Sequence, residues 1–261
     1  MVIPQTLVRE HFEGQASLWK EIYESDTVEG AVYRTRQDKV LAIAERLPVA
    51  PDAREDARVL ELGCGAGWNV AALAQRGYRV HAVDLVPRML VTTREVCDSR
   101  HVGDRVTRFC ADAEALPFAD GYFDVVIGIA LLEWVSSAKA FGEIARVMRP
   151  GGYAILTATN RWSLQRCLDP LLNPAMEPVK NAVRRMSGAR AHSRTHSLRE
   201  IDRSFAAAGL IRQEALTAGF GPFTFFKRKL LPGPRGARLH RLLQRFLSRA
   251  GYAHIVMAVK P

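Results

Sequence analysis

Short apolar runs alternate with amphipathic stretches along this 261-residue chain. Apolar runs of four to eight residues, bounded by glycine, proline or polar residues, are typical of buried strands. Seven strands are predicted, at 59–62, 80–83, 106–110, 123–128, 153–159, 211–218 and 253–259, and two of them, 106–110 and 211–218, include polar residues. Helical periodicity separates most of them, so the pattern predicts an α/β protein with a largely parallel sheet.

The segment before the first strand has helical periodicity. A helix over 33–47 is predicted to follow a break at 28–31, and a polar linker over 48–57 leads into the first strand. Four apolar residues of the first stretch are spaced for one helix face: Val8, Phe12, Ala16 and Trp19.

The region after residue 160 is organised differently. Residues 160–196 contain three prolines and a basic run without clear periodicity, so we interpret them as an insertion that is helical in parts. Ser197 opens a helix with a capping box. Near the C-terminus, a basic amphipathic helix is predicted. We expect five of its residues to form an apolar face buried against the core or the insertion, and the alternative is that this face lies on an anionic membrane. The five are Leu239, Leu242, Leu243, Phe246 and Leu247.

The most informative stretch is 59–84. A strand leads into a glycine loop, a helix follows, and a second strand ends on Asp84. Glycine lets the backbone approach a ligand closely, and a carboxylate at the second strand tip can accept hydrogen bonds from ribose hydroxyls. The dinucleotide pattern G-x-G-x-x-G fails because its last position is Trp68. The pattern present is E-x-G-x-G-x-G, from Glu61 to Gly67.

With this motif the sequence resembles the class I S-adenosylmethionine-dependent methyltransferases. The resemblance covers about residues 55–160 and includes the Arg-Pro-Gly-Gly turn at 149–152. It implies a Rossmann-like, doubly wound, mostly parallel seven-stranded sheet and S-adenosylmethionine as cofactor. It also implies an N-terminal helical lid (1–52), a cofactor-binding core (53–160), a helical cap insertion (161–196) and a C-terminal part of the core (197–261).

The same resemblance assigns cofactor contacts by position. The amino-acid end of the cofactor would contact the loop, the ribose would bind Asp84, and the adenine amino group would meet Asp112. The lid is expected to draw on Trp19, Tyr23, Tyr33 and Arg34. The residues that it implies for cofactor binding are Glu61, Gly63, Cys64, Gly65, Gly67, Asp84, Leu85, Met89, Asp112, Ala113, Ile129 and Tyr33.

Two short segments, Leu132-Glu133-Trp134-Val135 and Thr159–Trp162, resemble the ubiquinone-biosynthesis O-methyltransferases. That group is thought to bind a divalent metal through two glutamates and a histidine, but here Ala130 and Trp134 replace two of the three. We therefore expect no metal site. Glu133, His196 and His192 are the candidates for a catalytic base, and binding of a substrate amine is a second role open to Glu133. Alternatively, Glu133 is a solvated acid at a helix start, and His196 caps a helix.

Charge is uneven along the chain. Residues 1–160 contain 18 Lys/Arg and 22 Asp/Glu, whereas residues 161–261 contain 19 and 5. The basic C-terminal region suggests an acidic partner, an anionic membrane surface or nucleic acid. No RNA-binding motif is recognisable, and 128–131 reads Gly-Ile-Ala-Leu where RNA amine methylases often carry Asn-Pro-Pro-Tyr. Nucleic acid is thus the less favoured partner, and peripheral membrane contact through residues 223–229 stays open.

The expected function is methylation of a small molecule, at oxygen in a biosynthetic pathway. A nitrogen or carbon acceptor and an RNA-binding protein are the alternatives. Four cysteines without C-x-x-C spacing and an N-terminus without an apolar signal core predict a cytoplasmic protein. The acceptor and the oligomeric state do not follow from the sequence.

Overall fold

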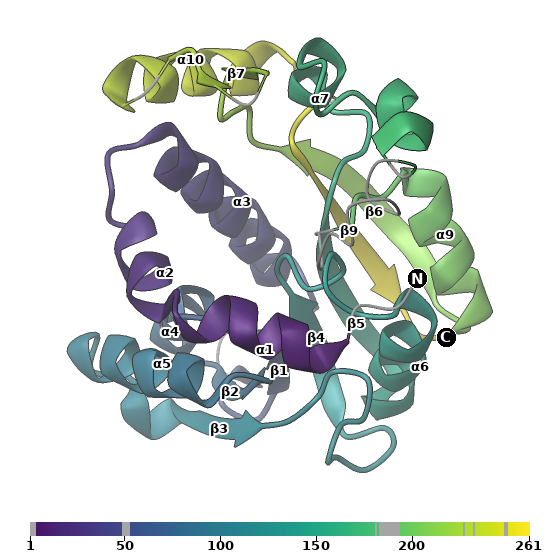
Figure 1. Cartoon of the computed structure of the whole chain (residues 1–261). Coiled ribbons are helices and arrows are strands. Elements are labelled where there is room, and N and C mark those ends of the chain that lie inside the picture. The colour runs from purple at the N-terminus through teal and green to yellow at the C-terminus, as the bar shows by residue number, and fades with distance from the viewer. Residues whose placement is uncertain are drawn as a thin grey trace.

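The computed structural model of the chain describes residues 4–48, 53–180, 182, 194–226, 228–231, 233–247 and 250–261. Its centre is a seven-stranded sheet in the order β3-β2-β1-β4-β5-β9-β6 (Figure 1). The first five strands in this order are parallel, and β9 is antiparallel to both neighbours. The predicted fold class is confirmed. The strands are β1 (Arg58–Leu62), β2 (Arg79–Asp84), β3 (Val106–Cys110), β4 (Phe123–Gly128), β5 (Met148–Thr159), β6 (Ile211–Ala218) and β9 (Ala253–Val259).

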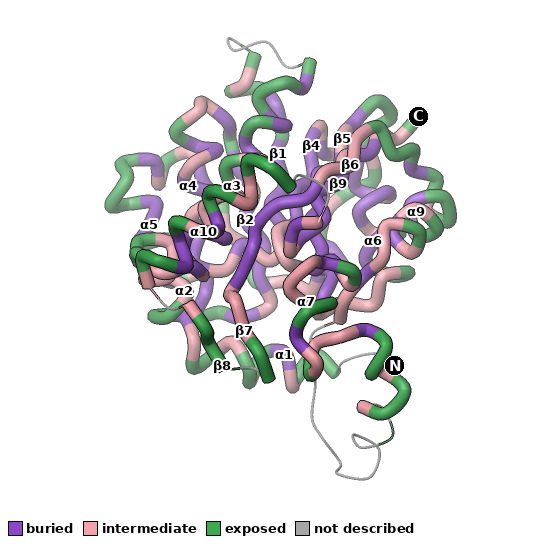
Figure 2. Tube along the Cα trace, turned by 90° about the horizontal axis from the view of Figure 1, so that it is seen from above, coloured by how far each residue is buried: buried purple, intermediate pink, exposed green. Residues whose placement is uncertain are grey.

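Helices cover both faces of the sheet. On one face α3, α4 and α5 form one hydrophobic cluster with the strands, and on the other face α6 and α9 form a second. In Figure 2 the strands appear as a buried layer between helices with exposed outer turns. Strands covered on both faces need side chains that are apolar in both directions, which explains the uninterrupted apolar runs. The helices are α3 (Val28–Glu45), α4 (Trp68–Gln75), α5 (Pro87–Ser99), α6 (Ser137–Val147) and α9 (Leu198–Ala207).

The remaining elements lie at the edges of this sandwich. Two short helices begin the chain, and a hairpin and a helix lie between β6 and β9. Among the described residues, no helix is both long and apolar enough to cross a bilayer. These elements are α1 (Gln5–Glu13), α2 (Ala16–Ile22), α7 (Leu164–Leu168), β7 (Thr224–Phe225), β8 (Arg228–Lys229), α10 (Gly233–Phe246) and the 3-10 turns Gly103–Arg105 and Pro174–Met176.

The break between the N-terminal helices is not at 28–31, where we expected it. It lies between Ile22 and Val28, because Thr27 caps α3 by accepting a hydrogen bond from the Gly30 amide at 3.1 Å. Gly30 is part of the helix. A Cβ there would lie 2.5 Å from the Ile22 carbonyl oxygen, so glycine serves close packing at this position and does not interrupt the helix.

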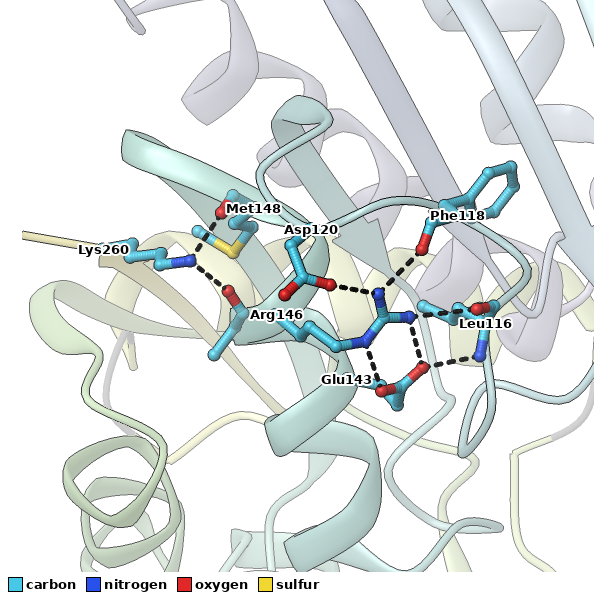
Figure 3. Close-up of polar contacts among 8 residues, drawn as sticks. Leu116, Phe118, Asp120, Glu143, Arg146, Met148 and Lys260 are labelled. Atoms are coloured by element: carbon cyan, nitrogen blue, oxygen red, sulfur yellow. Dashed lines mark hydrogen bonds and ion pairs between the residues drawn. The ribbon is translucent and has the colours of Figure 1, made fainter.

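A polar network fixes the loop between β3 and β4 (Figure 3). Arg146 of α6 donates to the carbonyl oxygens of Leu116 and Phe118 and pairs with Glu143 and Asp120. The Leu116 amide in turn donates to Glu143 at 2.6 Å. Charge-assisted bonds of this kind are stronger than neutral ones. The network therefore anchors residues 116–120 to α6.

Helix α10 is present but does not pack as predicted. Its buried residues are Gly236, Ala237 and His240, and the His240 ring bonds the Thr35 hydroxyl of α3 at 2.9 Å. By contrast, Leu242, Phe246 and Leu247 are 55, 70 and 40% exposed. Small residues let two helix backbones approach closely, so α10 packs on α3 through its small residues, and Leu242 and Phe246 face outward. The expected burial was therefore wrong for Leu242, Phe246 and Leu247, whereas Leu239 and Leu243 are partly buried.

This orientation of α10 predicts different effects for two substitutions. Ala237→Leu should overpack the α3 contact and lower the free energy of unfolding by about 1–3 kcal/mol. Leu242→Gln should change it by less than about 0.5 kcal/mol, because the side chain is already in solvent. Urea denaturation of both variants measures this difference. A larger loss for Leu242→Gln would contradict the observed orientation.

Candidate functional site

A cavity of about 350 Å³ opens at the carboxyl ends of the central strands. In an open parallel sheet this edge is the usual ligand site. Strands β1 to β4 supply its floor through the loops that follow them, and α1, α2 and α3 supply its cover. All twelve residues predicted to bind the cofactor line this single cavity, although they come from five separate parts of the chain.

The conformation of the glycine loop after β1 lets a ligand come close to the loop backbone. Gly63, Gly65 and Gly67 have φ angles of 63, 53 and 85°, in the left-handed region that favours glycine. A Cβ on Gly67 would also lie 2.7 Å from the Thr93 Cγ2 atom of α5. The Thr93 hydroxyl donates to the Gly65 carbonyl at 2.8 Å. The loop is therefore held against α5.

Asp84, at the end of β2, holds the same loop from the other side. Its two carboxylate oxygens accept hydrogen bonds from the Gly65 amide at 2.8 Å and the Val86 amide at 2.9 Å. Burial raises the pKa of Asp84, and these amides together with that of Leu85 oppose the rise. Each oxygen has a second lone pair, so the side chain can also accept from a ligand hydroxyl.

Glu61 lies at the inner end of the cavity. It is 2% exposed, and the Asn69 amide donates to its Oε2 atom at 2.6 Å. Burial raises the pKa of Glu61 to about 8, while the Asn69 bond lowers it. Without a cationic ligand group nearby, this carboxyl favours its protonated form near neutral pH.

Cys64 has the unreactive role expected for a small loop residue. Burial raises the pKa of its thiol well above the usual range, and the neighbouring Asp84 carboxylate raises it further. A thiol without an accessible thiolate form is a poor nucleophile. Cys64 therefore contributes shape to the cavity.

The loop after β3 supplies Asp112 and Ala113. Asp112 Oδ1 accepts a hydrogen bond from the Glu114 amide at 2.8 Å, and its Oδ2 accepts one from the Gln5 side chain of α1. The first helix of the chain thus reaches across the cavity to the far strand. Gln5 is a site residue that sequence periodicity did not identify, because it is a polar residue at the exposed start of a helix.

Aromatic rings form most of the cover. Trp19 meets Tyr33 edge-on at 5.4 Å between ring centroids, and Tyr23 stacks on Tyr33 at 5.8 Å. Phe12 meets Trp134 edge-on at 4.9 Å. Rings from α1, α2 and α3 therefore contact each other and the loop after β4 and form an apolar cover over the cavity. Trp19, Tyr23 and Tyr33 lie where the predicted lid placed them.

The arginine in the cavity is Arg36 and not Arg34, which we had expected in the lid. Arg34 donates to the carbonyl oxygens of Tyr23 and Ser25 on the outer side of α3. Arg36 is 4% exposed and lies 4.8 Å from the Tyr33 ring centroid. Residues three apart share a helix face, so Arg36 reaches the cavity together with Tyr33 once the rotation of α3 is fixed.

Glu133, in the loop after β4, faces the same space. It is 3% exposed, and its Oε1 atom accepts hydrogen bonds from the Thr159 amide at 2.7 Å and the Thr159 hydroxyl at 2.8 Å. Its Oε2 atom is buried and has no hydrogen-bond partner within the described part of the chain. The same holds for the Nε atom of Arg36 and the Nε1 atom of Trp19, which also line the cavity. Buried polar atoms normally have partners, so their convergence indicates a polar ligand.

His196 lies elsewhere. It is buried beside Asn160, its Nε2 atom bonds the Leu132 carbonyl oxygen at 3.0 Å, and it is not among the residues that line the cavity. The helix cap that the alternative gave to His196 belongs to Ser197, which forms a complete capping box with Glu200. His192 lies outside the described residues. Within the described ranges no three His, Cys, Asp or Glu side chains are grouped as metal ligands.

Comparison with known proteins agrees with this geometry. Residues 60–156 match the family model described as "Methyltransferase domain". The chain is 39% identical over 139 residues to a demethylmenaquinone methyltransferase of Clavibacter sepedonicus, covering 50% of this chain and 54% of that protein. It is 34% identical over 161 residues to a malonyl-[acyl-carrier protein] O-methyltransferase of Halorhodospira halophila, covering 60% and 49%.

The fold recurs in a solved structure of magnesium protoporphyrin IX methyltransferase from Synechocystis with bound SAH. The TM-score is 0.65 at 18% identity, and the match covers 98% of this chain and 99% of that one. The chain spans about half the length of most of the curated relatives that it matches. The family model matches residues 60–156, which include the loops after β1 to β4 that line the cavity.

The buried state of Glu61 predicts a pH-dependent stability. An unfolded glutamate ionises near 4.5, whereas Glu61 ionises near 8 in the folded protein. The unfolded state therefore releases this proton first, and Glu61 lowers the stability of the ligand-free protein as pH rises through this window. Glu61→Gln should remove this loss, so its melting temperature relative to wild type should rise by several degrees between about pH 5 and about pH 8.

Glu10→Gln, an exposed change on α1, is the matched control and should parallel wild type across the range. A constant difference between Glu61→Gln and wild type at both pH values would show that Glu61 titrates at its ordinary pKa.

Proposed function

We propose that this chain, which carries the methyltransferase domain of the class I S-adenosylmethionine-dependent family in residues 60–156, methylates a small molecule at oxygen. The observation that carries the proposal is the free, buried Oε2 atom of Glu133 in a cavity whose other residues fit the cofactor.

The residues of the cavity fit each part of that cofactor. Asp84 and Leu85 border the ribose position, and Met89, Asp112 and Ala113 border the adenine position. The polar atoms without partners would face the methionine part and the acceptor. Arg36 would hold the carboxylate of the methionine part, and Glu61 or a backbone carbonyl of the glycine loop would face its ammonium group. An ammonium group beside Glu61 would favour the ionised carboxylate.

The cofactor supplies a methyl group that its sulfonium already activates. The chain must hold an acceptor in line with that methyl group and exclude water, because orientation and exclusion of solvent are the main contributions available. The rings of Phe12, Trp19 and Trp134 cover the cavity and provide an apolar wall for the acceptor. Helices α1 to α3 would act together as the lid.

Glu133 would complete the site as a general base. A hydroxyl acceptor becomes more nucleophilic as its proton is taken, and a carboxylate within hydrogen-bond reach can take it. The two bonds from Thr159 hold one oxygen of Glu133 still and leave the other directed into the cavity. His196 has no comparable access, because its ring bonds Leu132 behind the loop.

The cofactor assignment predicts unequal roles for two aspartates. Asp84→Ala should weaken binding of the demethylated cofactor, S-adenosylhomocysteine, at least tenfold more than Asp112→Ala, because Asp84 would accept two charge-assisted bonds from the ribose hydroxyls and Asp112 only one from the adenine amine. Titration calorimetry measures both affinities. Equal losses would contradict the assigned orientation of the nucleoside.

The base assignment predicts a rate effect without a binding effect. Once an acceptor is found in a panel of phenols, carboxylic acids and amines, Glu133→Gln should lower kcat at least about 100-fold. Affinity for S-adenosylhomocysteine should stay within about threefold. The product is identified by mass spectrometry, which also reports whether the methyl group is on oxygen.

Thr159 provides the matched pair for this experiment. Thr159→Val removes the hydroxyl that holds Glu133 and should lower kcat, whereas Thr159→Ser retains the hydroxyl and should remain close to wild type. Full activity of Glu133→Gln, or a product methylated at nitrogen or carbon, would overturn the proposal.

A further inference from the structure

Large exposed apolar side chains are concentrated in one part of the chain. Among the described residues, fourteen large hydrophobic side chains are exposed, and eleven of them lie in two segments, 162–179 and 225–247. Exposed apolar side chains that occur singly need no explanation, whereas a contiguous group marks an interaction surface. The eleven are Trp162, Leu168, Leu171, Met176, Val179, Phe225, Phe226, Leu230, Leu242, Phe246 and Leu247.

These residues come from segments that the fold brings together. In Figure 1, α7, β7 and α10 lie along the same side of the molecule. The Thr224 hydroxyl of β7 donates to Asp169 at the end of α7 at 2.5 Å, and the Leu164 amide of α7 donates to the Ala250 carbonyl after α10 at 3.1 Å. We call the exposed residues of α7, the β7–β8 hairpin and α10 the outer surface.

The outer surface is also strongly basic. Residues 219–247 contain seven Lys/Arg and no Asp or Glu. The described cations of this segment are all exposed. One of them, Lys229, pairs with Glu29, and the other described cations form no ion pair within the described residues. They are Arg228, Arg235, Arg238, Arg241 and Arg245.

Folding does not account for this arrangement. Helix α10 is anchored to α3 through Gly236, Ala237 and His240, so its outward Leu242 and Phe246 contribute little to the core. At the hairpin, Phe225 and Phe226 are 48 and 53% exposed next to Arg228. Large apolar groups beside arginines, on a helix and a hairpin tip, are the composition of segments that lie in a membrane interface.

We propose that the outer surface docks the protein peripherally on an anionic lipid bilayer. The arginines would lie at the level of the lipid phosphates, and the leucine and phenylalanine side chains would enter the acyl boundary. A second copy of the chain fits poorly, because the same surface on both copies would place cations against cations. Nucleic acid would neutralise the arginines but would leave Leu242 and Phe246 without an apolar partner.

Docking in this orientation would bring the cavity close to the bilayer. Helix α10 contacts α3 through the bond between His240 and Thr35. Tyr33 and Arg36, within two residues of Thr35 on α3, line the cavity. One helix would therefore separate the membrane from the site. The proposal concerns binding to lipid and does not depend on the reaction catalysed.

Flotation with lipid vesicles tests the proposal. The full chain should float with vesicles of equal parts phosphatidylcholine and phosphatidylglycerol at about 0.15 M salt, and should not float with phosphatidylcholine alone. The double variant Leu242→Gln, Phe246→Ser should bind at least roughly tenfold more weakly. So should Arg238→Glu, Arg241→Glu, because both cations would face lipid phosphate.

Two matched variants control for loss of an exposed residue as such. Val91→Gln on α5 and Arg199→Glu on α9 remove an exposed apolar side chain and an exposed cation from other faces, and both should bind vesicles like wild type. Melting temperature and affinity for S-adenosylhomocysteine should be unchanged in all four, which separates failure of this proposal from failure of the cofactor site.

Several results would overturn the proposal. These are no binding of wild type to anionic vesicles, equal binding by the outer-surface variants, or binding to neutral vesicles alone. A concentration-dependent dimer that these variants abolish would reassign the surface to contact between copies. Tighter binding to RNA than to anionic vesicles would reassign it to nucleic acid.

Discussion

The hydrogen bonds between Asp84 and the glycine loop are the constraint on which the site depends. Asp84 ends β2, and its carboxylate accepts the amide of Gly65 from the loop after β1. Parallel pairing of β1 with β2 brings the two strand ends together, and this bond then fixes the loop to the neighbouring strand. Thr93 of α5 closes the other side. The loop can therefore present its backbone to a ligand without moving.

Around Arg36 and Glu133, by contrast, the cavity contains buried polar atoms that lack hydrogen-bond partners. Arg36 and Glu133 are both almost fully buried, and each leaves a polar atom without a partner in the described part of the chain. Burial of such atoms lowers the stability of the ligand-free protein, and a ligand that supplies the missing partners recovers that free energy. The aromatic cover strengthens these interactions by excluding water. Stability and ligand binding are thus coupled through the same side chains.

In the C-terminal region, a single helix combines a side that packs on the core with a side that is exposed. In α10 the small side chains form the contact with α3, whereas Leu242, Phe246 and the arginines face outward. The sheet itself is completed by β6 and β9, so the exposed surface between them is free to vary without altering the core. This separation is the reason that substitutions on the outer side of α10 can probe binding without unfolding the protein.

Apolar periodicity determined the strands, their approximate bounds and the sheet, because buried parallel strands must be apolar on both faces. The resemblance carried by the E-x-G-x-G-x-G motif implied twelve cofactor-binding candidates, and all of them line one cavity. Eleven lie at or after strand ends that the topology brings to one edge, whereas Tyr33 comes from α3. Three features required the tertiary structure. The buried side of α10 depended on how closely two helices could approach, which favoured Gly236 and Ala237 over leucine. The presence of Arg36 in the cavity depended on the rotation of α3, and the exclusion of His196 depended on its bond to Leu132. The apolar pattern of a sequence shows which positions are hydrophobic. These three outcomes depend instead on side-chain size, on helix rotation and on hydrogen bonds between distant segments.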